Sequence, residues 1–304
     1  KKNLKTIIFI SCLIILSIFI VFNNIKSDCW YVNYMNYSDM HEISSGKSQK
    51  IALIDSGISK FQKVYKNINL TNSNNDYDTN GHGTMMYSII KGYNKNNQTI
   101  EGISPDSRII LIKVMNDDES INPNVIEDAI DYALNEKVDI ISLSLGSTKT
   151  DINIKQKIDK ANLKNITVVS SAGDYKQGFL LFPASLNNVI SVGSIDDRRD
   201  ISTLTNAPQK TLINAPGEKI KVIDNNNNVF YGKGTSEATA IITGYIALMR
   251  DTNISSTQIL TNEKIMNLLS QINKNEKTYL GALKEIRKKV SVSTGAFFSF
   301  DLSY

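Results

Sequence analysis

The chain has 304 residues, of which 41% are apolar and 21% are charged, the composition of an ordinary globular protein with one large core. The net charge of +4 is small against 34 basic and 30 acidic residues, and the basic residues are scattered, which argues against a nucleic-acid-binding surface. Only two cysteines occur, and one of them, Cys12, lies inside an apolar run, so no disulfide framework is expected.

The apolar run Ile7–Phe22 predicts export. Lys1, Lys2 and Lys5 precede it, and its length suits a secretory segment or a short membrane anchor helix. No small-x-small cleavage motif follows, so an uncleaved anchor is favoured over a removed signal peptide. The lysines would keep this end in the cytoplasm. We therefore expect localisation at the cell membrane with the folded domain outside the cell, or secretion if the segment is cleaved.

The chain divides into four predicted segments. Residues 1–22 are the signal anchor or signal peptide, and residues 23–49, rich in Asn, Ser and Tyr, are a tether or short pro-segment. Residues 50–275 form the main domain, and residues 276–304 form a C-terminal extension packed on it. Helical patterns at Thr257–Leu269 and Leu280–Lys289 precede a β-like stretch at Val290–Tyr304.

From Lys50 onward, short β-branched runs alternate with amphipathic stretches. The predicted strands are Ile51–Ile54, Arg108–Val114, Asp139–Ser144, Thr167–Ser171 and Val189–Val192. The predicted helices are Asn124–Glu136, Ile152–Leu163 and the almost wholly apolar Thr235–Met249. This alternation predicts an α/β fold: a doubly wound, mostly parallel sheet with helices on both faces.

Three glycine-flanked segments carry the candidate reactive groups: IALIDSG with Asp55, NGHGTM with His82, and GKGTSEATA with Ser236. A serine hydroxyl is a weak nucleophile at neutral pH unless a base takes its proton, and an imidazole has a suitable pKa. A carboxylate can hold that imidazole in one tautomer and stabilise the imidazolium that forms. Ser236 opens a helix, where backbone N–H groups can meet a developing oxyanion. The three residues therefore predict nucleophilic acyl transfer.

These segments resemble those of the subtilases, the subtilisin-like serine proteases, over roughly residues 50–250. Four further stretches follow the family's order: EGISPDSRIILIKVMN, VDIISLSLGS, ITVVSSAGD and INAPGEKI. The resemblance implies a subtilisin-like fold, serine endopeptidase activity on polypeptides, and Asp55, His82 and Ser236 as the catalytic triad. It also implies a substrate cleft lined by the backbone of Leu143, Ser144, Leu145, Gly146, Ser171, Ala172 and Gly173.

Two acidic residues depart from the family pattern. Asp174 stands where the family usually has an asparagine that donates an N–H to the oxyanion, and loss of such a donor costs about 10²–10³ in turnover. An ionised aspartate can only accept, so Asp174 assists only if burial raises its pKa and keeps it protonated. Glu237, directly after Ser236, adds acidity, which predicts either a preference for basic substrates or an adjusted pH response.

The sequence therefore predicts a membrane-anchored extracellular serine endopeptidase that works through an acyl-enzyme. The alternative is a catalytically impaired subtilase that serves as a peptide-binding module, and an esterase or transpeptidase would use the same acyl-enzyme. No cofactor is expected. Many relatives bind structural calcium, but no site can be assigned here, because Asp76, Asp78 and the cluster at 117–119 are interpreted as solvated loop charges. We expect a monomer, and the Asn-, Lys- and Ile-rich composition is typical of a bacterium with an AT-rich genome.

Overall fold

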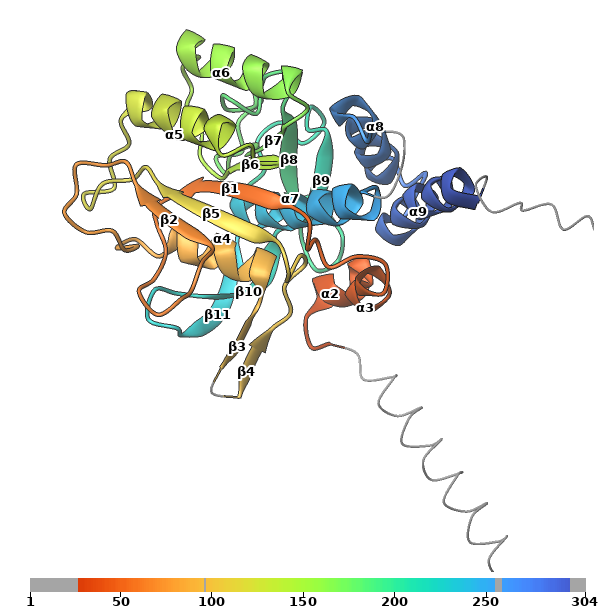
Figure 1. The fold of residues 1–304 in the computed structure, drawn as a ribbon. Helices are drawn as coiled ribbons and strands as arrows, with labels where there is room; N and C mark the ends of the chain where they lie inside the picture. The colour runs from red at the N-terminus through yellow and green to blue at the C-terminus, as the bar shows by residue number, and fades with distance from the viewer. Residues whose placement is uncertain (1–26, 96, 255–258, 296–304) are drawn as a thin grey trace, which may run out of the picture.

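The computed structural model describes residues 27–95, 97–254 and 259–295 (Figure 1). The apolar run Ile7–Phe22, predicted to be an anchor helix, lies outside these residues, and so does Cys12. Within the described ranges, no helix has both the length and the apolar character needed to cross a bilayer.

A seven-stranded parallel sheet with the order β2-β5-β1-β6-β7-β8-β9 forms the centre of the domain. Its strands are β1 (Lys50–Asp55), β2 (Lys66–Asn69), β5 (Arg108–Lys113), β6 (Ile140–Leu143), β7 (Thr167–Ser171), β8 (Ile190–Ile195) and β9 (Ile213–Pro216). Two antiparallel hairpins lie apart from the sheet: β3 (Tyr93–Lys95) with β4 (Gln98–Ile100), and β10 (Glu218–Ile223) with β11 (Val229–Lys233). The predicted parallel α/β architecture is confirmed.

Helices cover both faces of the sheet (Figure 1). They are α2 (Trp30–Met35), α3 (Tyr37–His41), α4 (His82–Lys91), α5 (Pro123–Asn135), α6 (Ile152–Leu163), α7 (Thr235–Thr252), α8 (Asn262–Asn273) and α9 (Tyr279–Gly295). Alternate residues of β1 enter two separate cores, because successive side chains of a strand point to opposite faces. Ile51 and Leu53 join the core that contains α4 and α7, whereas Ala52 and Ile54 join the core under α5 and α6. Burial on both faces explains why these strands are continuous apolar runs.

The strand order reverses beside β1, because the chain adds β5 on one side of it and β6 on the other. In open α/β sheets, ligand sites lie outside the carboxyl ends of the strands at such a reversal. Asp55 is the last residue of β1, and β6 and β7 end at Leu143 and Ser171. The candidate carboxylate and both candidate cleft segments therefore meet at one edge of the sheet.

The predicted strands and helices up to α7 match the structure closely, and α6 coincides with its prediction. The helical pattern predicted at Thr257–Leu269 corresponds to α8, which begins at Asn262 and ends at Asn273. Some elements of the main domain were not predicted, because they are too short to show a sustained hydrophobic period. They are helix α4, strands β2 and β9, and the two hairpins. Residues 290–295 continue helix α9, so the β-like prediction is wrong there. Adding a residue to an existing helix needs no new nucleus, which outweighs the small intrinsic penalty of valine and threonine. Residues 296–304 lie outside the described ranges.

The described part of the predicted tether packs against the domain. Tyr31, Met35, Tyr37 and Met40 are almost completely buried and join the same core as α7 and α9. The indole Nε1 of Trp30 donates a hydrogen bond to the carbonyl of Glu218 at 2.9 Å. Large aromatic and methionine side chains bury enough apolar surface to hold this short segment in place, so it is not a free tether.

Tyr37 tests this packing. Its ring is fully buried against that of Tyr31, and its hydroxyl is one of the buried polar groups of the described chain that lack a hydrogen-bond partner. Tyr37→Phe should therefore leave the free energy of unfolding unchanged or raise it by about 1 kcal/mol. Tyr37→Ala should lower it by about 3–5 kcal/mol, because the ring leaves a cavity. Urea unfolding measures both, and equal losses in the two variants would contradict the prediction.

Candidate active site

A short hydrogen bond joins two of the predicted catalytic residues. Oδ1 of Asp55 accepts from Nδ1 of His82 at 2.7 Å, and the same oxygen accepts from the backbone N–H of Ser56 at 2.8 Å. Asp55 is 5% exposed at the end of β1, and His82 is half-buried as the first residue of α4. Because Nδ1 is held by the carboxylate, Nε2 is the nitrogen available to accept a proton.

Asp78 holds the first turn of the helix that begins at His82. Its Oδ1 accepts from the N–H of Gly81 at 2.7 Å, and its Oδ2 accepts from the N–H and the hydroxyl of Thr84 at 2.9 and 2.6 Å. A carboxylate at a helix N-terminus pairs with N–H groups that have no partner within the helix. The interpretation of Asp78 as a solvated loop charge is wrong, because this residue is only 5% exposed. The sequence did contain a signal for this capping role, because Asp78 lies four residues before His82 in a glycine-containing turn.

A buried lysine holds the loop that leads to this turn. The Lys113 side chain is fully buried, and its Nζ donates to the carbonyls of Asn75 and Tyr77 at 2.9 and 2.8 Å and to Oδ1 of Asp117 at 3.1 Å. Hydrogen bonds from Ser73 and Lys113 lower the pKa of Asp117, so this carboxylate is paired rather than merely solvated. Carbonyl and carboxylate oxygens of the kind that bind calcium are here satisfied by an ammonium group. The described residues contain no group of three or more His, Cys, Asp or Glu side chains that could hold a metal ion.

Ser236 is the second residue of α7 and is half-buried. Its backbone carbonyl accepts a hydrogen bond from the hydroxyl of Ser144 at 3.4 Å. Within the described part of the chain, the Ser236 hydroxyl itself makes no hydrogen bond, to His82 or to any other group. Catalytic hydrogen bonds are often long in an enzyme without substrate and tighten when substrate binds.

Asp174 caps α7, whose own N-cap residue is a glycine without a side chain. Its Oδ1 accepts from the N–H of Thr235 at 2.8 Å. Its Oδ2 lies 2.8 Å from the point where a Cβ of Gly234 would be, and Oε2 of Glu237 lies 3.0 Å from the same point. The two carboxyl groups therefore crowd around Gly234. Burial raises the pKa of Asp174, although the hydrogen bond from Thr235 opposes this.

Glu237 faces the interior of the domain and is 3% exposed. Burial raises the pKa of its carboxyl group to about 7, and the neighbouring Asp174 adds to this rise while His82 opposes it. A side chain buried in this way does not reach a substrate. The position of Glu237 therefore does not support the predicted preference for basic substrates. It does support the predicted influence on the pH response.

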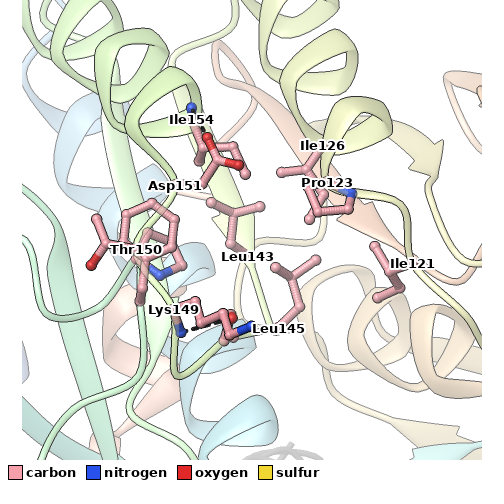
Figure 2. Close-up of a pocket in the computed structure, with 13 residues that line it drawn as sticks. Ile121, Pro123, Ile126, Leu143, Leu145, Lys149, Thr150, Asp151 and Ile154 are labelled. Atoms are coloured by element: carbon pink, nitrogen blue, oxygen red, sulfur yellow. Dashed lines mark hydrogen bonds between the residues drawn. The ribbon is translucent and has the colours of Figure 1, made fainter.

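The predicted cleft residues lie where β6 and β7 end. Leu143, Ser171, Ala172 and Gly173 are buried, Ser144 and Leu145 are half-buried, and Gly146 is exposed. A hollow of about 290 Å³ is lined by Asp55, His82, Ser144 and Leu145, among others. Leu145 also lines a neighbouring cavity of about 390 Å³ (Figure 2). The apolar residues of that cavity are Ile121, Pro123, Ile126, Leu143, Leu145, Ile154, Phe182 and Pro183.

The family model described as the Subtilase family matches residues 46–284. The chain belongs to this family. It is a subtilisin-like serine endopeptidase, and its substrates are polypeptides. The resemblance seen in the sequence is thereby confirmed.

Three curated subtilases show how far the similarity extends. The major intracellular serine protease of Bacillus subtilis is 33% identical over 231 residues, which cover 70% of this chain and 72% of that protein. The thermostable alkaline protease of Halalkalibacterium halodurans is 26% identical over 83% of this chain and 69% of its own length. The minor extracellular protease Epr of Bacillus subtilis is 28% identical over 73% of this chain, but the match spans only 35% of Epr.

Solved structures show the same fold. The prenylagaramide maturation protease PagA aligns with a TM-score of 0.68 at 22% identity, covering 84% of this chain and 99% of PagA. The protease domain of PatA aligns with the same TM-score at 21% identity and with the same coverage. At these identities the alignments establish the subtilisin-like fold of this subtilase.

The acidic surroundings of His82 predict an alkaline pH optimum. Burial alone would lower the pKa of His82, but the charge and hydrogen bond of Asp55, with Glu237 and Asp78, raise it to about 9. An imidazole acts as a base only when it is unprotonated, so kcat/KM should rise with pH up to about 9. Glu237→Gln removes a nearby negative charge, lowers the pKa of His82, and should move this rise to lower pH by about 0.5–1 unit.

The matched control for this pH profile is Glu263→Gln. Glu263 also lies in the first turn of a helix, α8, but its side chain is exposed. This variant should keep the wild-type profile. A Glu237→Gln profile that is unchanged or moved to higher pH would contradict the prediction.

Proposed function

We propose that Asp55, His82 and Ser236 are the triad of a working endopeptidase that cleaves polypeptides through an acyl-enzyme. The hydrogen bond of 2.7 Å between Asp55 and His82, at the carboxyl end of β1, is the observation that carries the proposal. Ser236 Oγ attacks the scissile carbonyl while His82 Nε2 takes its proton and then passes it to the leaving amine. A water molecule, activated by His82 in the same way, then attacks the acyl-enzyme and releases the acyl group. Asp55 stabilises the imidazolium in both steps.

Asp174 assists in this proposal as a neutral acid. Its Oδ1 is occupied by the Thr235 N–H, so Oδ2 is the oxygen that carries the proton. Burial raises the pKa of Asp174, and the Glu237 carboxyl close to the same glycine disfavours a second negative charge. A protonated carboxyl group can donate an O–H to the oxyanion, as the amide of an asparagine donates an N–H.

The enzyme in this proposal is a monomer anchored in the cell membrane with its catalytic domain outside. The apolar run Ile7–Phe22 and the lysines before it support the anchor. The names of the relatives include both extracellular and intracellular proteases, so they do not decide the location. Resistance of the full chain to alkaline extraction from membranes, together with digestion of its domain by protease added to intact cells, is the expected result.

A fluorophosphonate probe tests the triad directly, because it reacts only with an activated serine. The wild-type chain should be labelled at Ser236. His82→Ala should slow labelling by about 10³-fold or more, and Ser236→Ala should abolish it. Mass spectrometry of the labelled peptide identifies the site. Absence of labelling in folded wild-type protein would contradict the proposal and favour a peptide-binding module.

Asp174→Asn separates the two proposed roles of this side chain, which are to accept the Thr235 N–H and to donate a hydrogen bond to the oxyanion. The amide oxygen still accepts from the Thr235 N–H, and the amide nitrogen donates at every pH. The variant should therefore be about 10–100-fold faster than wild type at every pH at which Asp174 has lost its proton. Asp174→Ala, the control that loses both roles, should be slow at every pH and less stable by about 1 kcal/mol. A kcat–pH profile of Asp174→Asn parallel to wild type would contradict the proposal.

A further inference from the structure

The space between the two cleft segments is filled by one side chain, that of Leu181. A Cβ added to Gly146 would lie 2.8 Å from Cβ and 3.0 Å from Cδ1 of Leu181. A Cβ added to Gly173 would lie 2.7 Å from the same Cδ1. Carbon atoms in contact are normally about 3.5–4.0 Å apart, so neither segment has free space towards the other.

Hydrogen bonds from both segments hold this leucine in position. The N–H of Leu181 donates to the carbonyl of Ala172 at 3.2 Å. The next residue, Phe182, exchanges two backbone hydrogen bonds with Ser147, of 2.8 and 2.9 Å. Leu181 is 6% exposed. Its backbone thus bridges the ends of both segments, and its side chain fills the gap between them.

The gap lies beside the proposed nucleophile. The Ser144 hydroxyl donates to the carbonyl of Ser236 at 3.4 Å, and the Gly173 N–H donates to the hydroxyl of Thr235 at 3.2 Å. The first turn of α7 is therefore flanked by one segment on each side. When Ser236 attacks a peptide carbonyl, with the oxyanion towards Asp174, the residue that supplies this carbonyl lies over the gap. We call it the acyl residue.

We propose that Leu181 limits the acyl residue to glycine, alanine or serine; this inference rests on the proposed attack by Ser236. A larger side chain would have to displace a buried leucine that is packed on both sides, and such overpacking is costly in a dense interior. A small acyl residue buries little apolar surface itself. Peptide affinity therefore comes from elsewhere in the cleft, where the apolar cavity of about 390 Å³ remains open (Figure 2).

Peptidyl diphenyl phosphonates that differ only in the acyl residue test this size limit. The four probes carry the phosphonate counterparts of Gly, Ala, Leu and Phe, and each reacts covalently with an activated serine. On the full-length wild-type chain, the Ala probe should label Ser236 about 10²-fold faster than the Phe probe. Leu181→Gly and Leu181→Ala should speed labelling by the Leu and Phe probes about tenfold or more.

Leu180→Ala is the matched control. Leu180 is the chain neighbour of Leu181, is half-buried, and lines a different hollow. This variant should keep the wild-type order of the four probes. If Leu181→Gly and Leu181→Ala do not fold, Leu181→Val widens the gap by a smaller amount. This variant should still speed labelling by the Leu probe relative to the Ala probe.

Two results overturn the size limit alone: a Phe probe that labels wild type as fast as the Ala probe, or folded Leu181 variants that keep the wild-type order. A different result overturns the proposed function and, with it, this inference. In that case neither the phosphonates nor a small fluorophosphonate without an acyl residue labels folded protein. The simple fluorophosphonate thus distinguishes a failed size limit from an inactive serine.

Discussion

The hydrogen bond between the buried carboxylate of Asp55 and the imidazole of His82 is the interaction on which the proposed chemistry depends. Removing a carboxylate from water is costly unless its oxygens are hydrogen-bonded, and here Nδ1 of His82 and the N–H of Ser56 satisfy one of them. Strand β1 is paired on both sides, which fixes the position of the carboxylate. The sheet thereby determines the orientation of the ring, and the ring determines where a nucleophile and a substrate have to lie.

Two helix N-termini meet at this place, and an aspartate from outside each helix caps it. Asp78 binds the first turn of α4, and Asp174 binds the N–H of Thr235 at the start of α7. Asp78 is therefore electrostatic as well as structural, because its charge, with those of Asp55 and Glu237, raises the pKa of His82. Asp55, which orients the imidazole, contributes most to this rise, and Asp78, which caps α4, adds to it, so the base is most effective in alkaline solution. A substitution that keeps hydrogen-bond acceptance, as asparagine does, is needed to separate these two effects.

The sequence was sufficient for β1, β5, β6, β7 and β8 of the sheet, and it singled out the candidate reactive residues, because both leave local patterns. Strands buried on both faces are continuous apolar runs, and Asp55, His82 and Ser236 each stand within two residues of a glycine at the start or end of an element. Contacts between distant segments leave no such pattern. Lys113 was missed because its burial depends on a loop that only the fold brings close, whereas Asp78 had a local signal, its place four residues before His82, that was misinterpreted.

Leu181 was missed for the same reason, since it lies in an irregular segment between β7 and β8 and contacts glycines on two other stretches of the chain. The amino-terminal helices show the limit of composition as a guide. Asn, Ser and Tyr together are typical of linkers, yet the tyrosines and methionines of residues 31–40 lie in the main core. Composition counts side chains, whereas packing depends on which of them the fold brings to a common face.

The ammonium group of Lys113 gives the loop before His82 a cation that is covalently part of the polypeptide. A dissolved ion occupies such oxygens only in proportion to its concentration, and a chelator can withdraw it. A tethered ammonium is present at unit occupancy in every folded molecule. At these three oxygens, the loop that leads to the turn presenting the histidine is therefore held by a cation that cannot dissociate from the chain.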